Sequence, residues 1–410
     1  MTSTAPADVF SGALGADRIE TADLARYEVD GLRPSCAVTP RSPEEAARAL
    51  AAANGAGLAV IPFGAGTMMG FGNIPARYDV ALDLRGLQRV IEYTPEDLTV
   101  TVEAGLRLSD VNALLTERGQ FLPFDPPCGD HATIGGIVAT NAAGPSRHQY
   151  DVPRDRLIGV TVALADGRLT KAGGRVVKNV AGYDLCKLYC GSMGTLGVIV
   201  AATFKVAPLP REEAVWVAPL PSVRDAFAVG FAALGRPLAL RALELISPPL
   251  AVSAGLKRAW SVVAWCAGEP AAVARSLREL DSLAQGKARR DLDARRLTSW
   301  PADSAAVVLR LSLLPSDVQE ALEGLPETAK ASVTLAHGVA RVGLDADHPE
   351  LRARVERLGG TWALERAPLD LKRALDVWGP PPPAFAVMER LKREFDPRGT
   401  LSPGRFVGRL

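Results

Sequence analysis

A cluster of glycines directly after an apolar run constrains the fold of this chain more than any other feature. The segment VIPFGAGTMMGFGN at residues 60–73 carries four glycines behind a strand-like stretch. Glycine loses more backbone freedom on folding than any other residue, so such a cluster is kept where the backbone needs positive φ or close approach to a ligand. Backbone N–H groups in such a loop can form a concave nest for a phosphate. The segment therefore predicts a main-chain anion cradle, with an ordinary glycine-rich turn as the alternative.

The glycine spacing in this segment excludes two familiar phosphate loops. The dinucleotide fingerprint needs G-x-G-x-x-G at the start of a helix, and here Gly70 comes one residue too late after Gly64 and Gly66. Gly72 and Pro75 then prevent a helix from continuing. The triphosphate loop needs a lysine followed by serine or threonine, which the segment lacks. A pyrophosphate cradle built from a tight turn remains open, beside the ordinary turn.

Two further glycine clusters follow, ATIGGIVATNAAG at 132–144 and GSMGTLGVIV at 191–200. Small side chains let the main chain approach a flat or extended ligand, and Thr133, Thr140 and Asn141 add hydrogen-bonding groups. We interpret the three clusters as loops, each attached to a strand. Because they are spread over about 140 residues, they fit one long ligand better than a single phosphate.

The first half of the chain alternates between strand and helix patterns. Ser42 and Pro43 predict the start of a helix that ends near Asn54-Gly55. Ser109 predicts the cap of a second helix, and Asp166-Gly167 predicts a hairpin turn. The predicted strands cover residues 58–63, 79–84, 98–105 and 197–210, and the predicted helices cover 42–55, 107–119 and 183–190. This alternation predicts an α+β or α/β domain.

The pattern changes after Pro210, where a second α+β domain is predicted over residues 211–375. The proline run that begins at Gly379 is expected to act as a stiff spacer before a last helix and tail. In this half, helices are predicted at 220–234, 269–286 and 385–397, and strands at 238–247, 260–268, 305–315 and 340–346.

Composition limits the partners and the compartment. The 410 residues allow two or three domains, and a hydrophobic content of 48% with 23% charged residues is typical of a globular protein. A formal net charge of +1 gives no field that would attract nucleic acid or a lipid surface. No stretch of about 18 uncharged apolar residues predicts a membrane span. The N-terminal MTSTAPADVF has neither the basic nor the apolar region of a secretory signal. We expect a cytoplasmic protein that reaches a membrane only through partners.

The cysteines agree with a reducing compartment. The chain has five, at scattered positions, which is unlike a disulfide framework. Cys186 and Cys190 are four residues apart and would share a helix face, but no further cysteine or histidine lies nearby to complete a zinc or iron–sulfur site. We expect buried, small hydrophobic side chains and no metal.

Taken in order, the motifs resemble those of a known family. PFGAGT, ATIGGIVATNAAG, KNVAGYDL, GSMGTLGVI and the tail FDPRGTLSPGRF are similar to the FAD-binding domain of the vanillyl-alcohol oxidase / p-cresol methylhydroxylase (PCMH) family. The resemblance covers residues 30–210 and 385–406. It implies an α+β protein with a two-part PCMH-type FAD-binding domain at 30–210 and a smaller α+β cap domain at 211–375. A C-terminal helix and tail at 376–410 would then pack back on the FAD domain.

The resemblance assigns FAD-binding roles to four groups of residues. The first would hold the pyrophosphate through its amides, the second would line the diphosphate and flavin side, and the third would meet adenine and ribose through main chain. The groups are Pro62, Phe63, Gly64, Ala65, Gly66, Thr67, Met68 and Gly70; Thr133, Ile134, Gly135, Gly136, Asn141 and Gly144; Gly194, Gly197, Val198 and Ile199; and, fourth, Arg405. Arg405 would close on the flavin end, where its charge could stabilise the anionic reduced flavin.

The resemblance also implies how the flavin is held. Covalent attachment needs a histidine or cysteine at particular loop positions, and Thr67 and Met68 cannot bond to the flavin. We therefore expect non-covalent FAD. His131, just before the second cluster, is either a flavin neighbour or an ordinary loop histidine. Lys178, Tyr183 and Asp184 in KNVAGYDL either face the flavin or a partner, or form a capped turn.

The second half departs from the family in a way that bears on function. Stand-alone relatives that oxidise 2-hydroxy acids carry H-x-G-D-G-N-x-H, whereas this chain has LAHGVARVGL, with His337 and no second histidine. His348 is expected in a turn. Catalytic residues are therefore not assigned. Within the family the chain is most similar to the FAD-binding subunits of bacterial glycolate oxidases.

Three functions follow as alternatives. The first is an FAD-binding subunit of a glycolate oxidase complex, whose partners would be a sister FAD-containing catalytic subunit and an iron–sulfur subunit. The second is an autonomous FAD-dependent 2-hydroxy acid dehydrogenase. The third is a scaffold subunit that keeps the fold without holding flavin.

Overall fold

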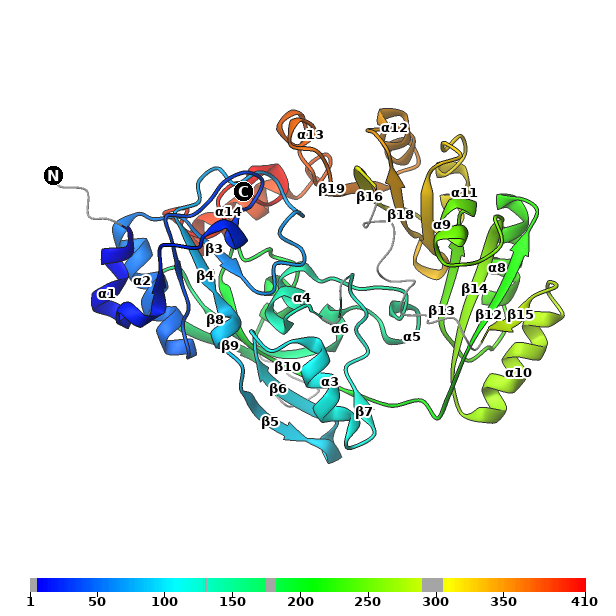
Figure 1. Cartoon of the computed structure of the whole chain (residues 1–410), viewed down its shortest axis with the longest axis horizontal. Helices are drawn as coiled ribbons and strands as arrows, with labels where there is room; N and C mark the ends of the chain where they lie inside the picture. The colour runs from blue at the N-terminus through cyan, green and yellow to red at the C-terminus, as the bar shows by residue number, and fades with distance from the viewer. Residues whose placement is uncertain (1–5, 128, 130, 175–181, 290–304) are drawn as a thin grey trace.

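The computed structural model describes residues 6–127, 129, 131–174, 182–289 and 305–410. In Figure 1 the N-terminal half of the chain lies on the left and the large sheet of the second half on the right. The C-terminal helix, red, returns to the blue strands of the N-terminal half. The two halves and the returning tail confirm the predicted α+β architecture.

A four-stranded sheet begins the N-terminal half, in the order β1-β2-β4-β3. Its strands β2, β4 and β3 are parallel, and α2 covers one face. As predicted, Ser42 caps α2 by accepting a hydrogen bond from the N–H of Glu45, and Gly57 ends it in the left-handed conformation. The elements are α1 (Pro6–Leu14), β1 (Ile19–Glu20), β2 (Cys36–Val38), α2 (Pro43–Ala56), β3 (Val60–Phe63) and β4 (Val80–Asp83).

A five-stranded antiparallel sheet forms the second part of this half, in the order β5-β6-β10-β8-β9. The predicted hairpin at Asp166-Gly167 is confirmed, because it joins β8 to β9. The elements are β5 (Val90–Thr94), β6 (Thr99–Glu103), α3 (Leu108–Thr116), β7 (Gln120–Phe121), β8 (Leu157–Ala163), β9 (Leu169–Gly173), α7 (Leu185–Tyr189), β10 (Val198–Lys205) and β11 (Ala207–Pro208). The prediction that Ser109 caps α3 is wrong: Arg107 holds the cap position without a side-chain bond. The helix starts earlier because the N–H of Leu108 is satisfied by the carbonyl of Ala132.

The second glycine cluster is a helix, α4 (Ile134–Thr140), and not the predicted loop. The hydroxyl oxygen of Thr133 caps it by accepting from the N–H of Gly136, and Asn141 ends it at φ 48°. Gly135 lets the first turn touch the neighbouring strand, since a Cβ there would lie 2.8 Å from that of Ala104. The glycines therefore serve close helix packing, which a pattern of small residues does not distinguish from a loop. Two one-turn helices follow, α5 (Arg147–Tyr150) and α6 (Pro153–Arg156).

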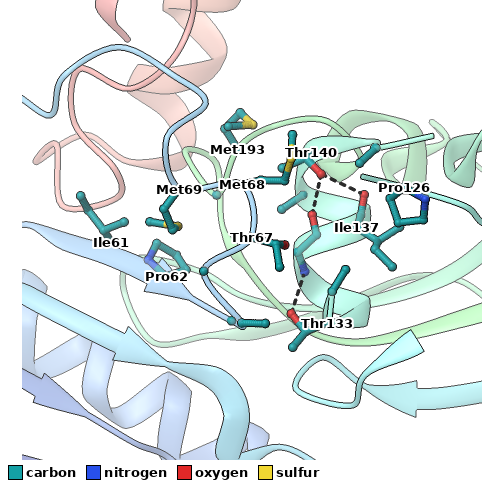
Figure 2. A pocket seen from close by; sticks show the side chains of 18 of the residues that line it. Ile61, Pro62, Thr67, Met68, Met69, Pro126, Thr133, Ile137, Thr140 and Met193 are labelled. Atoms are coloured by element: carbon teal, nitrogen blue, oxygen red, sulfur yellow. Dashed lines mark hydrogen bonds between the residues drawn. The ribbon is translucent and has the colours of Figure 1, made fainter. Parts of the chain in front are cut away.

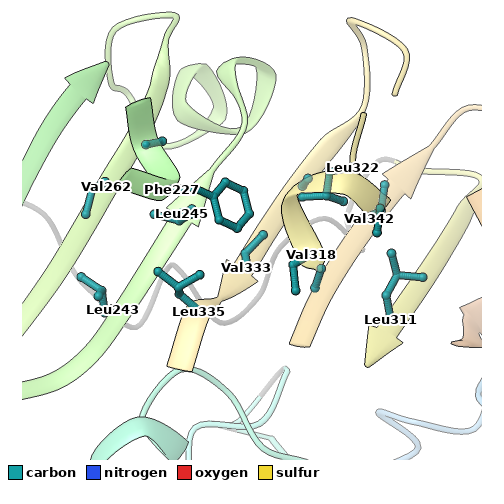
Figure 3. Packing of buried hydrophobic residues seen from close by; sticks show 14 of the residues in the cluster. Phe227, Leu243, Leu245, Val262, Leu311, Val318, Leu322, Val333, Leu335 and Val342 are labelled. Atoms are coloured by element: carbon teal, nitrogen blue, oxygen red, sulfur yellow. The ribbon is translucent and has the colours of Figure 1, made fainter. Parts of the chain in front are cut away.

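An eight-stranded antiparallel sheet organises the second half, in the order β15-β12-β14-β13-β17-β18-β16-β19. Helices cover one face, where Phe227 packs with Leu243 and Leu245 of β13 (Figure 3). The predicted strands are confirmed, whereas β12, β15, β17 and β19 were not foreseen. The strands are β12 (Glu212–Leu220), β13 (Leu240–Ile246), β14 (Trp260–Gly268), β15 (Lys287–Arg289), β16 (Val307–Ser312), β17 (Lys330–Thr334), β18 (Val339–Leu344) and β19 (Thr361–Arg366), and the helices are α8 (Val223–Leu234), α9 (Pro248–Ser253), α10 (Pro270–Asp281), α11 (Val318–Ala321) and α12 (Pro349–Arg357). We keep residue 211 as the proposed start of the cap domain.

The chain then returns to the FAD domain through α13 (Leu369–Ala374), the proline run and α14 (Phe385–Phe395). Leu401 forms a parallel bridge with Val60 of β3. The ammonium group of Lys392 donates to the carboxylate of Asp396 at 2.7 Å and to the carbonyls of Thr195 and Leu401. These contacts hold the tail beside β3, the strand that leads into the first glycine loop.

Candidate functional site

A cavity that opens to solvent lies where the first glycine loop, α4, the turn at Gly194 and the C-terminal tail meet (Figure 2). Its lining comprises Ile61, Pro62, Gly64, Ala65, Gly66, Thr67, Met68, Met69, Pro126, Pro127, Ala132, Thr133, Gly136, Ile137, Ala139, Thr140, Ala142, Met193, Gly194, Ser402 and Arg405. All three glycine clusters contribute, so segments far apart in the chain share one cavity.

The structure brings about half of the predicted FAD-binding residues together in this lining. They are Pro62, Gly64, Ala65, Gly66, Thr67, Met68, Thr133, Gly136, Gly194 and Arg405. Sequence reasoning named Thr140 as a hydrogen-bonding group but missed Ile137; the two follow Gly136 and Thr133 at helical spacing and line the cavity. Residues three and four apart share a helix face, so α4 presents one face to the cavity. A helical interpretation of this cluster would have found them.

The other predicted residues lie outside the lining, and their binding roles remain predictions. Asn141 accepts a hydrogen bond from the N–H of Arg154, while the N–H of Gly144 donates to Asp125. Phe63 packs edge-on against Tyr27 at 5.1 Å between ring centroids. The whole group is Phe63, Gly70, Ile134, Gly135, Asn141, Gly144, Gly197, Val198 and Ile199.

The backbone of the first loop requires glycine at specific positions. Gly66 has φ 78°, and a Cβ there would lie 2.9 Å from the ring of Phe63. Gly64 touches α4, because a Cβ there would meet the hydroxyl oxygen of Thr133 at 2.2 Å. A loop without side chains can present its amides to a diphosphate, and the apolar remainder of the lining suits a flat ring system. The residues present therefore fit an elongated dinucleotide such as FAD.

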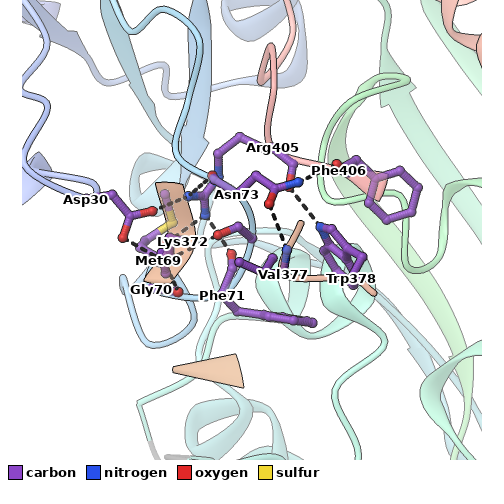
Figure 4. A network of polar contacts seen from close by, with 11 residues as sticks. Asp30, Met69, Gly70, Phe71, Asn73, Lys372, Val377, Trp378, Arg405 and Phe406 are labelled. Carbon is purple, nitrogen blue, oxygen red and sulfur yellow. Dashed lines mark hydrogen bonds and ion pairs between the residues drawn. The ribbon is translucent and has the colours of Figure 1, made fainter. Parts of the chain in front are cut away.

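Two buried cations hold the far side of the same loop (Figure 4). The ammonium group of Lys372 donates to the carbonyls of Gly70 and Gly72, and the guanidinium of Arg405 donates to those of Met69, Phe71 and Asn73. Five consecutive carbonyls thus bond to two side chains, which we call the carbonyl clamp.

Asp30 completes the carbonyl clamp by accepting from both cations, at 2.7 Å from Lys372 and 3.3 Å from Arg405. Burial lowers the pKa of Lys372, and the bond to Asp30 opposes that shift. The side chain of Arg405 is 3% exposed and its donors are engaged by the protein. Its placement supports a positioning role for the loop, while contact with a flavin stays a prediction.

A second group of buried charges lies where the cap sheet faces the FAD domain, and we call it the arginine cluster: Arg147, Arg310 and Arg341 with Glu244 and Glu365. The carbonyl of Ala143 accepts from Arg147 at 3.2 Å and from Arg341 at 3.1 Å. Helix α5, which carries Arg147, packs on β13, which carries Glu244. The cluster therefore joins the two halves of the molecule.

Carboxylates compensate the arginine cluster unevenly. Arg341 donates to Glu365 at 3.0 Å, whereas Arg310 lies 3.7 Å from Glu365, too far for a hydrogen bond. Burial would raise the pKa of Glu365, but Arg341 and Arg310 lower it. Burial raises the pKa of Glu244 to about 8, so this carboxyl is largely protonated at neutral pH. Burial also lowers the pKa of Arg147 to about 10, with Arg341 and Arg310 adding to the shift.

Two histidines lie beside this cluster. The rings of His148 and His337 are 6.4 Å apart at an interplanar angle of 79°. Burial lowers the pKa of His148, and His337 adds to that shift. Sequence analysis considered His337 alone, because nothing in the sequence connects it with His148 on α5. The pair does not reproduce the H-x-G-D-G-N-x-H pattern of the stand-alone relatives, which this sequence lacks.

The remaining candidate residues have simpler places. His131 is exposed. His348 caps α12 by accepting from the N–H of Leu351. Asp184 caps α7, as the capped-turn alternative predicts, and Tyr183 is 95% exposed; Lys178 lies outside the described residues. The four described cysteines, Cys36, Cys186, Cys190 and Cys266, are free and buried.

The described part of the chain contains neither a group of metal-ligating side chains nor a membrane-spanning helix. There, no three histidine, cysteine or acidic side chains gather as a metal site would require. No helix in those same ranges has both the length and the apolar character needed to cross a bilayer.

Comparison with known families and proteins supports the cofactor interpretation. Residues 34–173 match the family described as "FAD binding domain". The mitochondrial cytochrome-linked D-lactate dehydrogenase of Arabidopsis thaliana is 35% identical over 213 residues, which is 52% of this chain and 37% of that protein. Glycolate oxidase subunit GlcD of Bacillus subtilis is 35% identical over 178 residues (43% and 38%), and subunit GlcE of Escherichia coli is 42% identical over 131 residues (32% and 37%). The chain therefore spans well under two thirds of these relatives.

Solved structures extend the likeness of the fold over nearly the whole chain. p-Cresol methylhydroxylase with substrate bound aligns at a TM-score of 0.75 and 18% identity, covering 98% of this chain and 96% of that one. Alkyldihydroxyacetonephosphate synthase aligns at 0.74 and 16%, covering 94% and 82%. The fold is therefore of PCMH type.

Proposed function

We propose that this chain, which has a PCMH-type fold and matches the family "FAD binding domain" over residues 34–173, is the FAD-binding subunit of a glycolate oxidase complex that oxidises 2-hydroxy acids to 2-oxo acids. The observation that carries the proposal is the convergence of three glycine clusters on one cavity. FAD bound there would supply the acceptor for the two electrons that leave the substrate. The similarity to both GlcD and GlcE supports the choice of a glycolate oxidase.

The proposal gives the residues of the cavity distinct roles. The amides of Gly64 to Met68 hold the diphosphate, and Thr133 and Gly136 on α4 close the opposite wall. Pro126 and Pro127 help exclude water with rigid, apolar surface. Binding is non-covalent, because the loop side chains Thr67 and Met68 offer no group that bonds to a flavin.

The visible spectrum of the purified full chain tests the cofactor part of this proposal. We expect a yellow protein whose flavin is released by denaturation, with about one FAD per chain. A colourless preparation that cannot be reconstituted with FAD would instead favour the scaffold alternative. A flavin that stays attached after denaturation would contradict non-covalent binding.

Partners are the finer part of the proposal. We propose a sister FAD-containing catalytic subunit and an iron–sulfur subunit that accepts electrons. Tagging the chain in its native source and purifying it gently should recover both. Recovery of a flavin-loaded chain without either would contradict the complex.

The second candidate is an autonomous 2-hydroxy acid dehydrogenase, which the arginine cluster and the paired His148 and His337 favour. A neutral imidazole can accept the hydroxyl proton of a substrate while its carbon is oxidised. Anaerobic mixing of the yellow protein with glycolate or D-lactate separates the candidates. Rapid bleaching without partners would establish autonomy, and slow or absent bleaching supports a subunit.

A further inference from the structure

The cap sheet places like charges against one another on the face opposite its main helix layer. Arg310 on β16 and Arg341 on β18 are direct cross-strand partners. Like charges at such positions are destabilising unless something compensates them. The neighbouring residues Leu309, Leu311, Ala340 and Val342 pack under the cap helices, so both arginines point to the other face.

Only part of the compensation comes from the chain itself. Glu365 sits at a register shift between β16 and β19, an irregularity that sets its carboxylate between the two arginines. Burial raises the pKa of Asp125 and of Glu244, the other acidic groups that interact with Arg147 and Arg341. Three partly buried guanidinium groups thus face one carboxyl whose pKa is lowered.

We propose that Arg147, Arg310 and Arg341 bind the carboxylate of a small organic acid at the junction of the FAD domain and the cap. Guanidinium groups match the planar geometry of a carboxylate and are the usual partners of buried ones. The assignment of this acid as the substrate rests on the second candidate under the proposed function, the autonomous 2-hydroxy acid dehydrogenase. The site itself rests on the charges and their contacts.

The arginine cluster adjoins the cavity at two points. Ala142 lines the cavity, and the carbonyl of the next residue, Ala143, accepts from both Arg147 and Arg341. Met69 lines the cavity as well, and two residues later the guanidinium of Arg310 lies 5.5 Å from the ring centroid of Phe71. An acid held by the cluster would therefore lie next to a cofactor in the cavity.

Two polar atoms without partners support a ligand with a second polar group. Among the described residues, Oε1 of Glu244 and Nδ1 of His148 are buried and have no hydrogen-bond partner. A buried unsatisfied polar atom costs about 1–3 kcal/mol, so such atoms are usually satisfied by something. A protonated Glu244 can donate, and a neutral His148 can accept. The hydroxyl of a 2-hydroxy acid offers both kinds of partner.

The arginine side chains also leave room for a ligand. The side chain of Arg310 is 28% exposed, whereas those of Arg341 and Glu365 are 11% and 10% exposed. Arg310 is therefore the more accessible of the two strand arginines to an incoming anion. Arg147, which has no carboxylate within ion-pair distance among the described residues, would gain the most from the anion.

Calorimetric titration of the full chain tests this proposal. Sodium glycolate and sodium oxalate are titrated into the FAD-loaded and the FAD-free protein, with Arg147→Met beside the wild type. Loss of a charge-assisted hydrogen bond should weaken both acids about tenfold or more. Arg224→Met removes an exposed arginine of α8 and should leave both affinities unchanged.

Each outcome of the titration either supports or overturns the proposed carboxylate site. No binding of either acid at tens of millimolar to either form of the wild type overturns the site, as does unchanged affinity in a folded Arg147→Met. Equal affinity for chloride or phosphate overturns the carboxylate assignment. If Arg147→Met does not fold, Arg310→Met carries the same expectation. Binding of oxalate by a chain that cannot take up FAD supports the site while refuting the proposed function.

Discussion

Two groups of cations, the carbonyl clamp and the arginine cluster, differ in how fully the chain compensates them, and the contrast between them separates architecture from function. In the carbonyl clamp, Lys372 and Arg405 reach five carbonyls and the carboxylate of Asp30. In the arginine cluster, three guanidinium groups share one carbonyl and one ionised carboxylate.

This contrast has a physical meaning. Burying a charge is costly unless hydrogen bonds and countercharge replace the water that it loses. A cation whose N–H donors all bond to acceptors of its own chain needs no further partner, and its role is structural. A cation left short of partners in the native fold is expected to obtain them from a ligand. The predictions below test whether the two groups differ in this way.

The largest effect is expected in the carbonyl clamp, from Lys372→Met. The substitution leaves two carbonyls unbonded and removes one of the two cations from buried Asp30. Removing one partner of a buried pair costs about 3–5 kcal/mol. Urea unfolding of the FAD-free protein measures this loss of unfolding free energy.

A neighbour on the same helix supplies the matched control for that measurement. Arg373 pairs with Asp370, and the two side chains are 65% and 95% exposed. An exposed pair contributes less than about 1 kcal/mol, so Arg373→Met should change little. Equal losses in the two variants would mean that the carbonyl clamp does not stabilise the fold.

The next effect concerns the cavity side of the same loop, through Gly66→Val. Gly66 has φ 78°, and a side chain there would press on the ring of Phe63. A β-branched residue in the left-handed region costs about 1–3 kcal/mol of strain. We expect FAD affinity to fall about 5- to 100-fold, measured as flavin absorbance after dialysis.

Gly55→Ala is the control for the glycine substitution. Gly55 lies in α2, and a Cβ there would meet nothing within 4 Å. Alanine should stabilise the helix by about 0.5–1 kcal/mol and leave the flavin in place. A Gly66→Val protein that retains stoichiometric FAD would count against the loop as the diphosphate site.

The third prediction is a pH dependence in the arginine cluster. Glu244 has its pKa raised from 4.5 to about 8 by burial, so the folded state holds a proton that the unfolded state releases. Stability therefore falls as pH rises from about 5 to about 8, by up to about 1.4 kcal/mol per pH unit from this group. Arg147, Arg341 and Asp125 face the same carboxyl and set how much of that slope remains.

Glu244→Gln isolates this contribution, because glutamine does not titrate. We expect the variant to gain stability relative to the wild type as pH increases across that range. The difference between two urea-unfolding series, one for each protein, provides the measurement. Parallel pH profiles would show that Glu244 titrates as it does in the unfolded chain.

Sequence reasoning reached the parts of the site that depend on backbone. Gly64, Gly66 and Gly194 were assigned because glycine reports local conformation, and local conformation is what a short motif encodes. It missed that the second cluster is a helix, since small residues serve helix packing and loops equally. Consequently Ile137 was missed on the lining face.

The arginine cluster could not be predicted because it is a product of tertiary register. Arg310 and Arg341 become neighbours only through the pairing of β16 with β18, and Arg147 arrives from the other half of the molecule. One signal was available, since each strand arginine interrupts an apolar strand of alternating pattern. That pattern indicates which face of the sheet a side chain occupies, but not which residues pack against that face.

The smallest effect tests the contrast most sharply, and it comes from Arg147→Met in anion-free buffer. Burial disfavours this guanidinium, and its bond to Ala143 is shared with Arg341. Replacing a poorly compensated buried charge with an apolar side chain is often neutral or stabilising, so the unfolding free energy should change by less than about 1 kcal/mol.

Oxalate should then produce a difference in unfolding free energy between Arg147→Met and the wild type. At 100 times its dissociation constant for the wild type, the acid adds about 2.7 kcal/mol to wild-type stability and far less to a variant that binds more weakly. Urea unfolding with and without oxalate measures this difference. A loss near 3 kcal/mol without any anion would place Arg147 with Lys372 as a structural cation, and the distinction between the two groups would fail.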